Sequence, residues 1–580
     1  MIAAPVNARQ ETPPGECFLC AMDSQPCAVK KLEGIIISAH EFNSQGETMP
    51  YITIAVGGEL ATLRLTQTYR SLVKCLNGLG ADLRRRKLSL RVFHLPTAFA
   101  TSEHRGQTLH RYIASESTLA ILEPDTLLNI TDLNHADYCA RQYLLNRLAS
   151  SPQSAAAMRG NLVHSSFKEL LKEHDRGELM RGSVERGEET PLATLQRHFE
   201  QALERSSIDL AITNTSADEL RAEATPHLQS LANWFEQQHS SLWDMPAQPI
   251  SNTERETRDA ASENMVRAET FLLAPEIGLR GRLDVLWQQR SRQRLLELKT
   301  GGANGDLPKS AHRWQVQGYF SLLAVRRDPK LKNALATLLY SGTPGAATDF
   351  NLRFTITQFQ RVNETRNLLA FSHVTGIAPA PPGPSRCSKC AMLEQCQSVS
   401  SLLDWQPPQP DKAEGNGQHE QVQPARQAVE RYSETDRAFF KRYYSLLHLE
   451  EREIEAQQAL LWQTPVKERV AQGSAICDLR LIEKAVPTGQ GEWLQTFACE
   501  NTSELREGDE ILLSDGDPVT GEVVTGTILS ISSEQVTTWT PELIAHPRLI
   551  DRYATSIVHV RTLQNLLRWL QADAHLRELV

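Results

Sequence analysis

The feature that most limits how this chain can fold is a predicted β-hairpin at residues 278–302, GLRGRLDVLWQQRSRQRLLELKTGG. Two strand-like segments flank a polar turn, which is typical of two antiparallel strands. If the hairpin is symmetric about residues 290–291, Asp284 lies opposite Glu297, and directly opposed residues have Cβ atoms about 4.5–5.5 Å apart. Two carboxylates at that separation destabilise the pair unless something positive lies between them.

Lys299 follows Glu297 by two residues and therefore projects from the same face of its strand. A hard divalent cation explains two carboxylates and a lysine at one place, because Mg²⁺ takes oxygen ligands at about 2.0–2.1 Å. Such an ion stabilises charge on a phosphate and lowers the pKa of bound water. Lys299 would then orient the attacking water. The alternative is an exposed, salt-bridged hairpin without a metal.

Two predicted helices add residues to this set. In MRGNLVH (158–164), Gly160 and His164 are four residues apart and share one helix face. Gly160 would allow close packing of the helix, and His164 is a third candidate metal ligand. Gln315 and Tyr319 share a face of the helix at 310–327, where an amide and a phenol can hold a phosphodiester. The alternatives are a packed histidine and a core tyrosine.

In chain order, these elements resemble the motifs of the RecB-type branch of the PD-(D/E)xK nuclease superfamily. The resemblance implies a restriction-endonuclease-like mixed sheet flanked by helices over residues 126–402. It also implies a metal site and a catalytic group. The implied metal ligands are His164, Asp284, Glu297 and the backbone carbonyl of Leu298; the implied catalytic residues are Asp284, Glu297, Lys299, Gln315 and Tyr319. Glu269, on the preceding strand, is a candidate for an outer role.

Four cysteines flank this core, with Cys139 before it and Cys387, Cys390 and Cys396 after it. Four thiolates can hold either a [4Fe–4S] cluster or a tetrahedral Zn²⁺, and spacing alone does not separate the two. The arrangement resembles that of iron–sulfur nucleases, such as the CRISPR-associated exonuclease, and this resemblance implies a [4Fe–4S] cluster. The cluster would staple distant parts of the domain together.

A second cysteine group, Cys17, Cys20 and Cys27, resembles half a zinc site. A fourth ligand is missing nearby unless His40 serves, so we expect no metal there.

The segments around the core resemble those of the flap-processing nuclease–helicase family. We expect an OB-like β-rich domain at 1–125, with strands at 51–56, 61–65 and 88–95, and a Pro-rich linker at 403–428. We also expect a stalk helix at 429–470, a small β-barrel at 471–556 and a C-terminal helix at 557–580. The predicted fold class is therefore multidomain α/β. No GxxxxGK[ST] sequence is present, so the helicase motor of that family is absent here. Either the chain is truncated, or a superfamily 1 motor is a separate polypeptide.

Composition limits the remaining possibilities. With 61 Lys and Arg against 70 Asp and Glu, the formal net charge is −9, which excludes a globally basic nucleic-acid binder but not a local basic groove. No apolar run reaches the roughly 18 residues of a membrane helix. The first residues, MIAAPVNARQETPP, do not form a signal peptide. We therefore expect a cytoplasmic protein in a reducing compartment, with no membrane partner.

Together these patterns predict a Mg²⁺- or Mn²⁺-dependent nuclease that hydrolyses phosphodiester bonds of single-stranded or flapped DNA. It would act with a helicase in DNA replication, repair or recombination, or in anti-phage defence. Two alternatives stay open. One is a non-catalytic DNA-binding scaffold for a helicase partner. The other is an RNA nuclease, because discrimination of the 2′-hydroxyl cannot be read from sequence.

Overall fold

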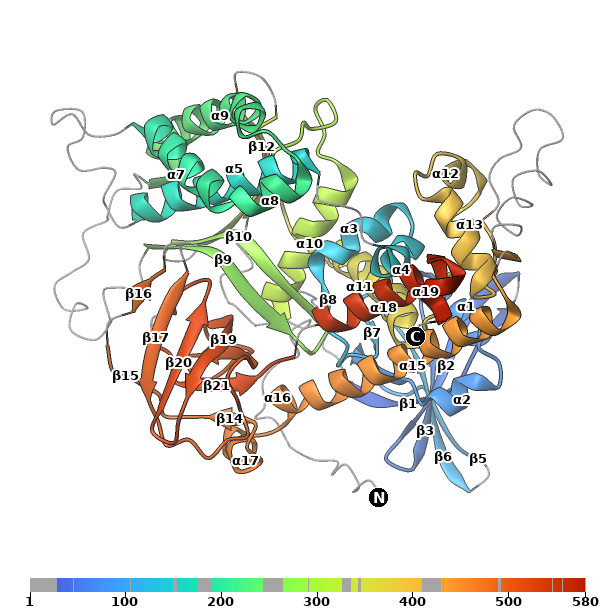
Figure 1. The fold of residues 1–580 in the computed structure, drawn as a ribbon. Coiled ribbons are helices and arrows are strands. Elements are labelled where there is room, and N and C mark those ends of the chain that lie inside the picture. Colours follow the sequence, from blue (N-terminus) through green and yellow to red (C-terminus); the bar gives the residue numbers. More distant parts are fainter. Residues whose placement is uncertain are drawn as a thin grey trace, which may run out of the picture.

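The computed structural model in Figure 1 is a mixed α/β protein built on three β-sheets, which confirms the predicted multidomain α/β class. The structure describes residues 29–578 except 45, 105, 150–153, 176–189, 244–263, 290–291, 326–334, 343–345, 409–428, 431, 484, 489–491, 545 and 555. Most of the predicted linker at 403–428 lies outside the described residues, as do Cys17, Cys20 and Cys27. None of the helices in the described ranges is long and apolar enough to cross a bilayer.

The N-terminal sheet has seven strands in the order β5-β6-β3-β2-β1-β4-β7. The three predicted strands are present, whereas the first strand and the two helices α1 (Arg70–Gly78) and α2 (Asp82–Arg86) were not predicted. The strands are β1 (Val29–Ser44), β2 (Glu47–Val56), β3 (Glu59–Arg64), β4 (Ser89–Leu95), β5 (Ala100–His104), β6 (Gln107–Ile113) and β7 (Leu119–Leu122).

The OB-like barrel predicted for residues 1–125 does not close among the described residues, where β5 and β7 end the sheet. Closure requires a barrel's two end strands to pair. Helix α11 (Ile356–Thr375) occupies the edge of β7 instead. Asn367 Oδ1 accepts from Leu122 N at 2.9 Å, and Asn367 Nδ2 donates to Ala120 O at 2.7 Å. A side-chain amide thus satisfies backbone groups that another strand would otherwise pair.

The central sheet has the order β13-β12-β11-β10-β8, with β9 also paired to β10. The predicted hairpin is present: β10 and β11 are antiparallel, and Val285 lies opposite Leu296, which is the predicted register. Strands β11 and β12 are parallel, so the sheet is mixed. The strands are β8 (Leu128–Asn129), β9 (Asn264–Ala274), β10 (Leu279–Gln289), β11 (Arg292–Lys299), β12 (Leu335–Tyr340) and β13 (Thr348–Leu352).

Helices cover both faces of the central sheet (Figure 1). Leu295 belongs to the same buried cluster as Val316 of α10 (Ser310–Val325), whereas its neighbours Leu296 and Leu298 belong to the cluster of Phe167 on α5 (Ala155–Asp175). Alternate residues of one strand thus face opposite layers. On the α10 side lie α3 (Ile130–Tyr138), α4 (Arg141–Leu148) and α11; on the α5 side lie α7 (Pro191–Arg205), α8 (Ser207–Thr213) and α9 (Ala217–Trp243).

Glycines allow the α10 layer to approach the sheet closely. A Cβ atom on Gly281 would lie 2.9 Å from Ile130 and 3.0 Å from Tyr319, and one on Gly318 would lie 2.8 Å from Ile130. A side chain at either position would push α3 and α10 away from β10. Helix α10 carries Gln315 and Tyr319 of the site described below.

The third sheet has the order β14-β21-β18-β19-β20-β17-β15, with β16 paired to β17. The barrel predicted at 471–556 does not close here either, because the end strands β14 and β15 have two residues each and do not pair with each other in the described chain. The strands are β14 (Ala475–Ile476), β15 (Arg480–Leu481), β16 (Val486–Pro487), β17 (Trp493–Ala498), β18 (Glu510–Ser514), β19 (Val523–Ile531), β20 (Gln535–Thr540) and β21 (Leu549–Arg552).

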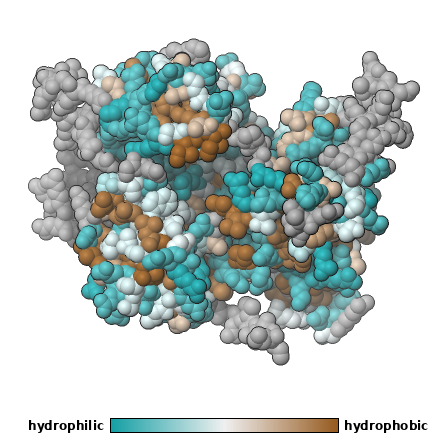
Figure 2. All heavy atoms as spheres, viewed as in Figure 1, coloured by the Kyte–Doolittle hydropathy of each residue, from teal (hydrophilic) through white to brown (hydrophobic). Residues whose placement is uncertain are grey.

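A long helix, α15 (Glu434–Gln458), lies in the range predicted for the stalk helix, and α16 (Leu460–Gln463) and α17 (Val466–Ala471) follow it. Helix α15 packs against α11 and against α18 (Ile557–Gln571), which α19 (Ala574–Glu578) follows. One continuous apolar core joins the N-terminal sheet, the central sheet, α15 and α18, whereas the third sheet has a core of its own. On the face seen in Figure 2, hydrophobic residues form separate patches on a largely hydrophilic surface.

Candidate functional site

The two strands of the central hairpin separate where the predicted carboxylates lie. The paired register ends at Val285 and Leu296, one residue short of Asp284 and Glu297. There the Asp284 side chain replaces a backbone acceptor, because its Oδ2 accepts a hydrogen bond from Leu298 N at 2.8 Å. This contact fixes the carboxylate beside the backbone of Leu298, the residue whose carbonyl is an implied metal ligand.

Helix α5 brings His164 to the same carboxylate. His164 Nδ1 lies 3.4 Å from Asp284 Oδ2, and the two side chains are 27% and 21% exposed, so solvent reaches this pair. Burial lowers the pKa of His164, but the charge of Asp284, the hydrogen bond to Asp284 and the charge of Glu297 together more than offset this, and the pKa lies above its ordinary value. One turn earlier on α5, a Cβ on Gly160 would lie 3.2 Å from Thr300 Oγ1. The glycine thus lets α5 approach the end of β11, as its position predicted.

Lys299 is held by two acceptors. Its Nζ donates to Glu297 Oε1 at 2.7 Å and to Gln315 Oε1 at 2.8 Å. Gln315 Nε2 donates to Tyr319 OH at 3.0 Å, and Tyr319 OH donates to the carbonyl of Arg282 at 2.8 Å. Gln315 and Tyr319 are both buried. Their contacts therefore fix Lys299 and β10. The sequence suggested that these two side chains hold a phosphodiester directly, but neither is placed to do so.

Glu297 is in an unfavourable environment for a charge. It is 3% exposed, and its second oxygen, Oε2, is buried without a hydrogen-bond partner. Burial and the neighbouring Asp284 raise the pKa of Glu297 to about 7. Burial alone would also raise the pKa of Asp284, but His164 and Lys299 hold it below its ordinary value. A buried carboxylate oxygen without a partner, beside a second carboxylate, is an arrangement that a cation would stabilise.

Glu269, the candidate for an outer role, lies on β9 opposite Asp284 of β10. The ladder pairs Thr270 with Leu283 and Ala268 with Val285, but the pair between them is missing. Glu269 itself has φ 52°, a left-handed conformation that is strained for a residue other than glycine. Burial raises the pKa of Glu269. A third carboxylate therefore lies at this edge of the site on strained backbone.

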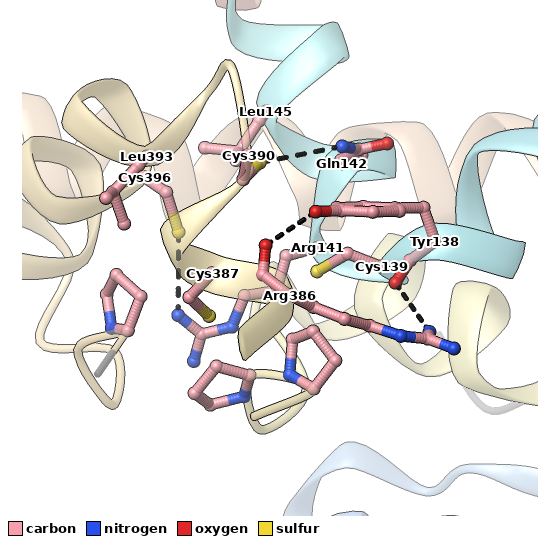
Figure 3. Close-up of a pocket in the computed structure, with 13 residues that line it drawn as sticks. Tyr138, Cys139, Arg141, Gln142, Leu145, Arg386, Cys387, Cys390, Leu393 and Cys396 are labelled. Carbon is pink, nitrogen blue, oxygen red and sulfur yellow. Dashed lines mark hydrogen bonds between the residues drawn. The ribbon is translucent and has the colours of Figure 1, made fainter. Parts of the chain in front are cut away.

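The four predicted cluster ligands lie together, although they come from distant segments (Figure 3). Cys139 lies between α3 and α4, and the other three lie on or between α12 (Pro384–Ser388) and α13 (Leu393–Leu402). All four line one cavity that opens to solvent. The structure thus brings together the residues Cys139, Cys387, Cys390 and Cys396, all with free thiols.

Donors surround these thiols. Arg141 NH1 lies 3.8 Å from Cys396 Sγ, and Gln142 Nε2 lies 3.8 Å from Cys390 Sγ. Arg141 is 1% exposed, and its NH2 group has no hydrogen-bond partner. A buried guanidinium of this kind calls for a negative partner, which deprotonated thiols would supply. The donor set therefore fits an anionic metal–thiolate group.

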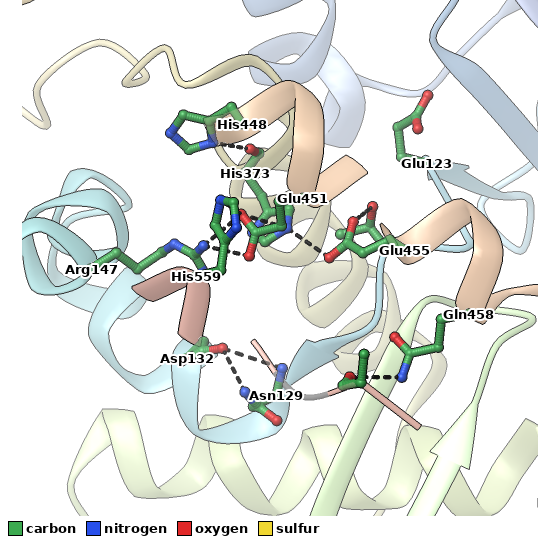
Figure 4. Close-up of polar contacts among 12 residues, drawn as sticks. Glu123, Asn129, Asp132, Arg147, His373, His448, Glu451, Glu455, Gln458 and His559 are labelled. Carbon is green, nitrogen blue, oxygen red and sulfur yellow. Dashed lines mark hydrogen bonds and ion pairs between the residues drawn. The ribbon is translucent and has the colours of Figure 1, made fainter. Parts of the chain in front are cut away.

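A third cluster was not predicted, and it lies between α4, α11, α15 and α18 (Figure 4). Among the described residues, His373, Glu451 and Glu455 bring three possible ligand atoms within 4.8 Å of one another. The two other clusters, around Glu297 and around the cysteines, do not meet that criterion. However, Arg147 NH2 donates to both oxygens of Glu451 at 2.6 Å, and His373 Nε2 lies 2.7 Å from Glu455 Oε1. These cations already neutralise the carboxylates, so we interpret the cluster as an ion-pair network.

Glu451 and Glu455 are four residues apart on α15, but no sequence signal connected them with Arg147 of α4 or His373 of α11. The remaining prediction concerns His40, the possible fourth ligand of the N-terminal cysteines. Its ring stacks on Tyr51 with 5.6 Å between centroids.

The fold and the first site together define an α/β protein with carboxylates, a lysine and a histidine at the open end of a hairpin. The sequence profile of the Dna2 family, described as DNA replication factor Dna2, matches residues 91–289. That range includes Cys139, His164 and Asp284 but ends before Glu297 and the other three cysteines.

Two curated proteins are similar over longer stretches, and both are named DNA replication ATP-dependent helicase/nuclease DNA2. The human protein is 23% identical over 446 residues, which is 68% of this chain and 38% of that protein. The chicken protein is 22% identical over 467 residues, or 73% and 44% of the two chains. The chain therefore spans about two fifths of the length of the relatives it matches. These matches support the likeness to a nuclease–helicase family that the motifs predicted.

Proposed function

We propose that this chain is a divalent-metal-dependent nuclease that hydrolyses phosphodiester bonds of single-stranded or flapped DNA. The observation that carries the proposal is the buried, unpartnered Oε2 of Glu297 beside Asp284, His164 and Lys299. The named relatives are helicase/nucleases that act in DNA replication, and this similarity supports the same class of reaction here. We place the reaction in the cytoplasm and in DNA replication or repair.

His164, Asp284, Glu297 and the carbonyl of Leu298 would hold Mg²⁺ or Mn²⁺. When bound, such an ion polarises a phosphoryl oxygen and lowers the pKa of its water. Lys299 carries a fixed positive charge toward the same place, because Glu297 and Gln315 together anchor its ammonium group. It can therefore hold the attacking water and offset the charge that develops on the phosphate. Tyr319 and Gln315 keep that ammonium group in position, so we assign them a positioning role.

The cysteine cavity completes the proposal. Cys139, Cys387, Cys390 and Cys396 would hold a [4Fe–4S] cluster with a structural role, joining α4 to α13 across the domain. The buried Arg141 suits a group with excess negative charge. The likeness of the cysteine arrangement to that of iron–sulfur nucleases favours a cluster over a single zinc ion.

A helicase partner belongs to the proposal, since both relatives carry helicase in their names. The outer face of α15 exposes Tyr443, Leu446 and Leu449, a possible contact surface for such a partner. We do not propose DNA unwinding by these 580 residues, which contain no phosphate-binding loop of the GxxxxGK[ST] type.

The test uses the full chain purified without oxygen. Single-stranded, flapped and blunt duplex DNA are incubated with Mg²⁺ or Mn²⁺, with and without ATP. We expect metal-dependent cleavage of the first two substrates and no effect of ATP. Cleavage of RNA in preference to DNA would move the proposal to an RNA nuclease, and binding without cleavage would favour a scaffold.

The same preparation tests the cluster. We expect iron and sulfide with absorbance near 400 nm, and we expect Cys139→Ala to lose both. That variant should also melt at a lower temperature, because the link between α4 and α13 is broken. An unchanged metal content and melting temperature would show that Cys139 is not a ligand.

A further inference from the structure

Helix α5 carries two lysines beyond the proposed metal ligand. His164, Lys168 and Lys172 are spaced by four residues, so they lie on one face of the helix. Each step moves about 6 Å along the helix axis. The lysines therefore lead away from the site, one and two turns beyond His164.

Both lysines are held by one carboxylate of the third sheet. Glu542, which follows β20, forms an ion pair through Oε1 with Lys168, and its Oε2 lies 2.8 Å from Lys172 Nζ. The three side chains are only 17–21% exposed. Burial acts to raise the pKa of Glu542, but the two ammonium groups hold that pKa below its ordinary value. The carboxylate is therefore ionised and bridges the two lysines.

This contact lies beside the proposed metal site. The charges of Lys168 and Asp284 both act on the pKa of Glu269, lowering and raising it respectively, so Glu269 lies near both groups. The third sheet makes two further contacts with the strands that carry these acids. Arg267 NH2 lies 2.8 Å from Glu522 Oε1, and Arg282 NH2 lies 3.5 Å from Thr525 Oγ1. In Figure 1 the third sheet accordingly lies against β9 and β10.

We propose that Lys168 and Lys172 bind phosphates of the DNA strand next to the scissile one, and that Glu542 occupies them until the strand displaces it. The position of the scissile phosphate rests on the proposed nuclease function. A carboxylate with one ammonium group on each oxygen makes the same charge-assisted contacts that two phosphate oxygens would make. The exchange replaces one bridging anion by another, so the lysines stay paired in both states.

The alternative is that Glu542 simply ties the third sheet to α5. The two roles predict opposite effects of Glu542→Gln. If Glu542 only ties the two elements together, loss of its charge weakens the interface and leaves DNA affinity unchanged or lower. If Glu542 occupies the phosphate site, loss of its charge frees two lysines and strengthens DNA binding.

The experiment measures binding of the full chain to a fluorescein-labelled single-stranded oligonucleotide without divalent cations, so that no DNA is cut. We expect Glu542→Gln to lower Kd about threefold to tenfold. We expect the double variant Lys168→Gln, Lys172→Gln to raise Kd and to reduce the salt dependence, the slope of log Kobs against log salt, by about 1.4, at about 0.7 per lost phosphate contact. Adding Glu542→Gln to that double variant should give no gain in affinity.

Glu522→Gln is the matched control, because it breaks another ion pair across the same interface with the same change in charge. Tighter binding by Glu542→Gln but not by Glu522→Gln supports the proposal. Equal binding by Glu542→Gln and wild type overturns it, and so does an unchanged salt slope in the lysine variant. Cleavage is assayed separately with Mn²⁺. If the binding effects appear without cleavage, the phosphate site stands and the nuclease assignment fails; cleavage without the binding effects gives the reverse.

Discussion

Two glutamates in this protein are almost equally buried and yet differ in charge behaviour. Glu297 of β11 is 3% exposed and Glu451 of α15 is 4% exposed. Burial opposes ionisation of both carboxyl groups. The pKa of Glu297 rises to about 7, whereas the pKa of Glu451 nevertheless falls to about 2. The difference comes from their neighbours, since burial is the same.

Around Glu451 positive charge is in place. Arg147 donates to both of its oxygens, and His373, whose pKa is raised by Glu451 and Glu455 despite burial, lies 3.6 Å away. Around Glu297 the nearest cation, Lys299, contacts one oxygen only, while Asp284 adds repulsion. The carboxylate of Glu451 is neutralised by the protein's own cations, whereas Glu297 has a carboxylate oxygen, Oε2, without a hydrogen-bond partner. A buried group of acids and histidines therefore indicates a metal site only where the protein's own cations leave it unsatisfied.

The largest expected effect separates the two clusters by activity. Asp284→Asn and Glu297→Gln should each lower metal-dependent cleavage about a hundredfold or more, because each removes a charged ligand from the metal. Glu451→Gln should leave the cleavage rate of the folded protein within a few fold. Rates are compared on single-stranded DNA with Mn²⁺, below the melting temperature of every variant. Full activity of either site variant would remove the active-site assignment.

The second effect separates them by stability. Arg147→Ala should cost about 3–5 kcal/mol of unfolding free energy, because it leaves Glu451 buried without its main partner. Lys441→Ala is the control, since Lys441 pairs with Asp404 at the surface, and loss of an exposed pair costs about 0–1 kcal/mol. Denaturant unfolding of both variants provides the comparison. Equal losses in the two variants would contradict the structural role of the network.

The third effect uses pH, with opposite signs at the two glutamates. Because the folded pKa of Glu297 is raised, its contribution to stability is present below about pH 4.5 and is lost as pH rises through about 7. The contribution of Glu451, whose folded pKa is lowered, is present above about pH 4.5 and is lost as pH falls toward 2. In metal-free protein, Glu297→Gln should therefore gain about 2–3 kcal/mol relative to wild type between pH 5 and pH 8.

Added Mn²⁺ should remove that difference by stabilising wild type, and more so at pH 8 than at pH 6, because the ion binds the deprotonated carboxylate. Melting curves at several pH values, with Mn²⁺ and with chelator, measure both terms. A Glu297→Gln variant whose melting temperature responds to Mn²⁺ as strongly as that of wild type would place the metal elsewhere.

The central hairpin shows why part of this molecule could be predicted. Its register depends on a turn and on strand alternation within 25 residues, and both are local properties of the sequence. The register of Val285 with Leu296 is as predicted, and the helices with His164 and Gln315 lie where their spacing indicated. The resemblance to iron–sulfur nucleases allowed the four cluster candidates to be grouped across a long stretch of chain.

What could not be predicted depends on contacts between distant segments. Nothing near Glu451 in the sequence indicates that Arg147 will neutralise it, and nothing near Glu542 indicates that it will meet Lys168. The edge of β7 is likewise covered by side chains of the distant helix α11, among them Asn363 and Asn367. Helix α1 did carry a local signal, because Leu72, Val73 and Leu76 have helical spacing, but the surrounding strands led us to predict a β-rich segment.

The smallest expected effect tests whether the site depends on geometry separately from stability. Gly160→Ala adds a Cβ that meets only Thr300 Oγ1 at 3.2 Å, and alanine favours a helix interior by about 1 kcal/mol over glycine. Stability should therefore stay equal or rise slightly. Cleavage should fall severalfold, because α5 must move from β11 and carries His164 away from Asp284.

Gly281→Ala is the contrast: its Cβ meets Ile130 and Tyr319 within 3.0 Å, so it should cost about 1–3 kcal/mol of unfolding free energy. Adding Thr300→Ala to Gly160→Ala should restore cleavage, since it removes the atom that the new Cβ meets. If Gly160→Ala loses activity only in proportion to lost stability, α5 does not set the position of His164.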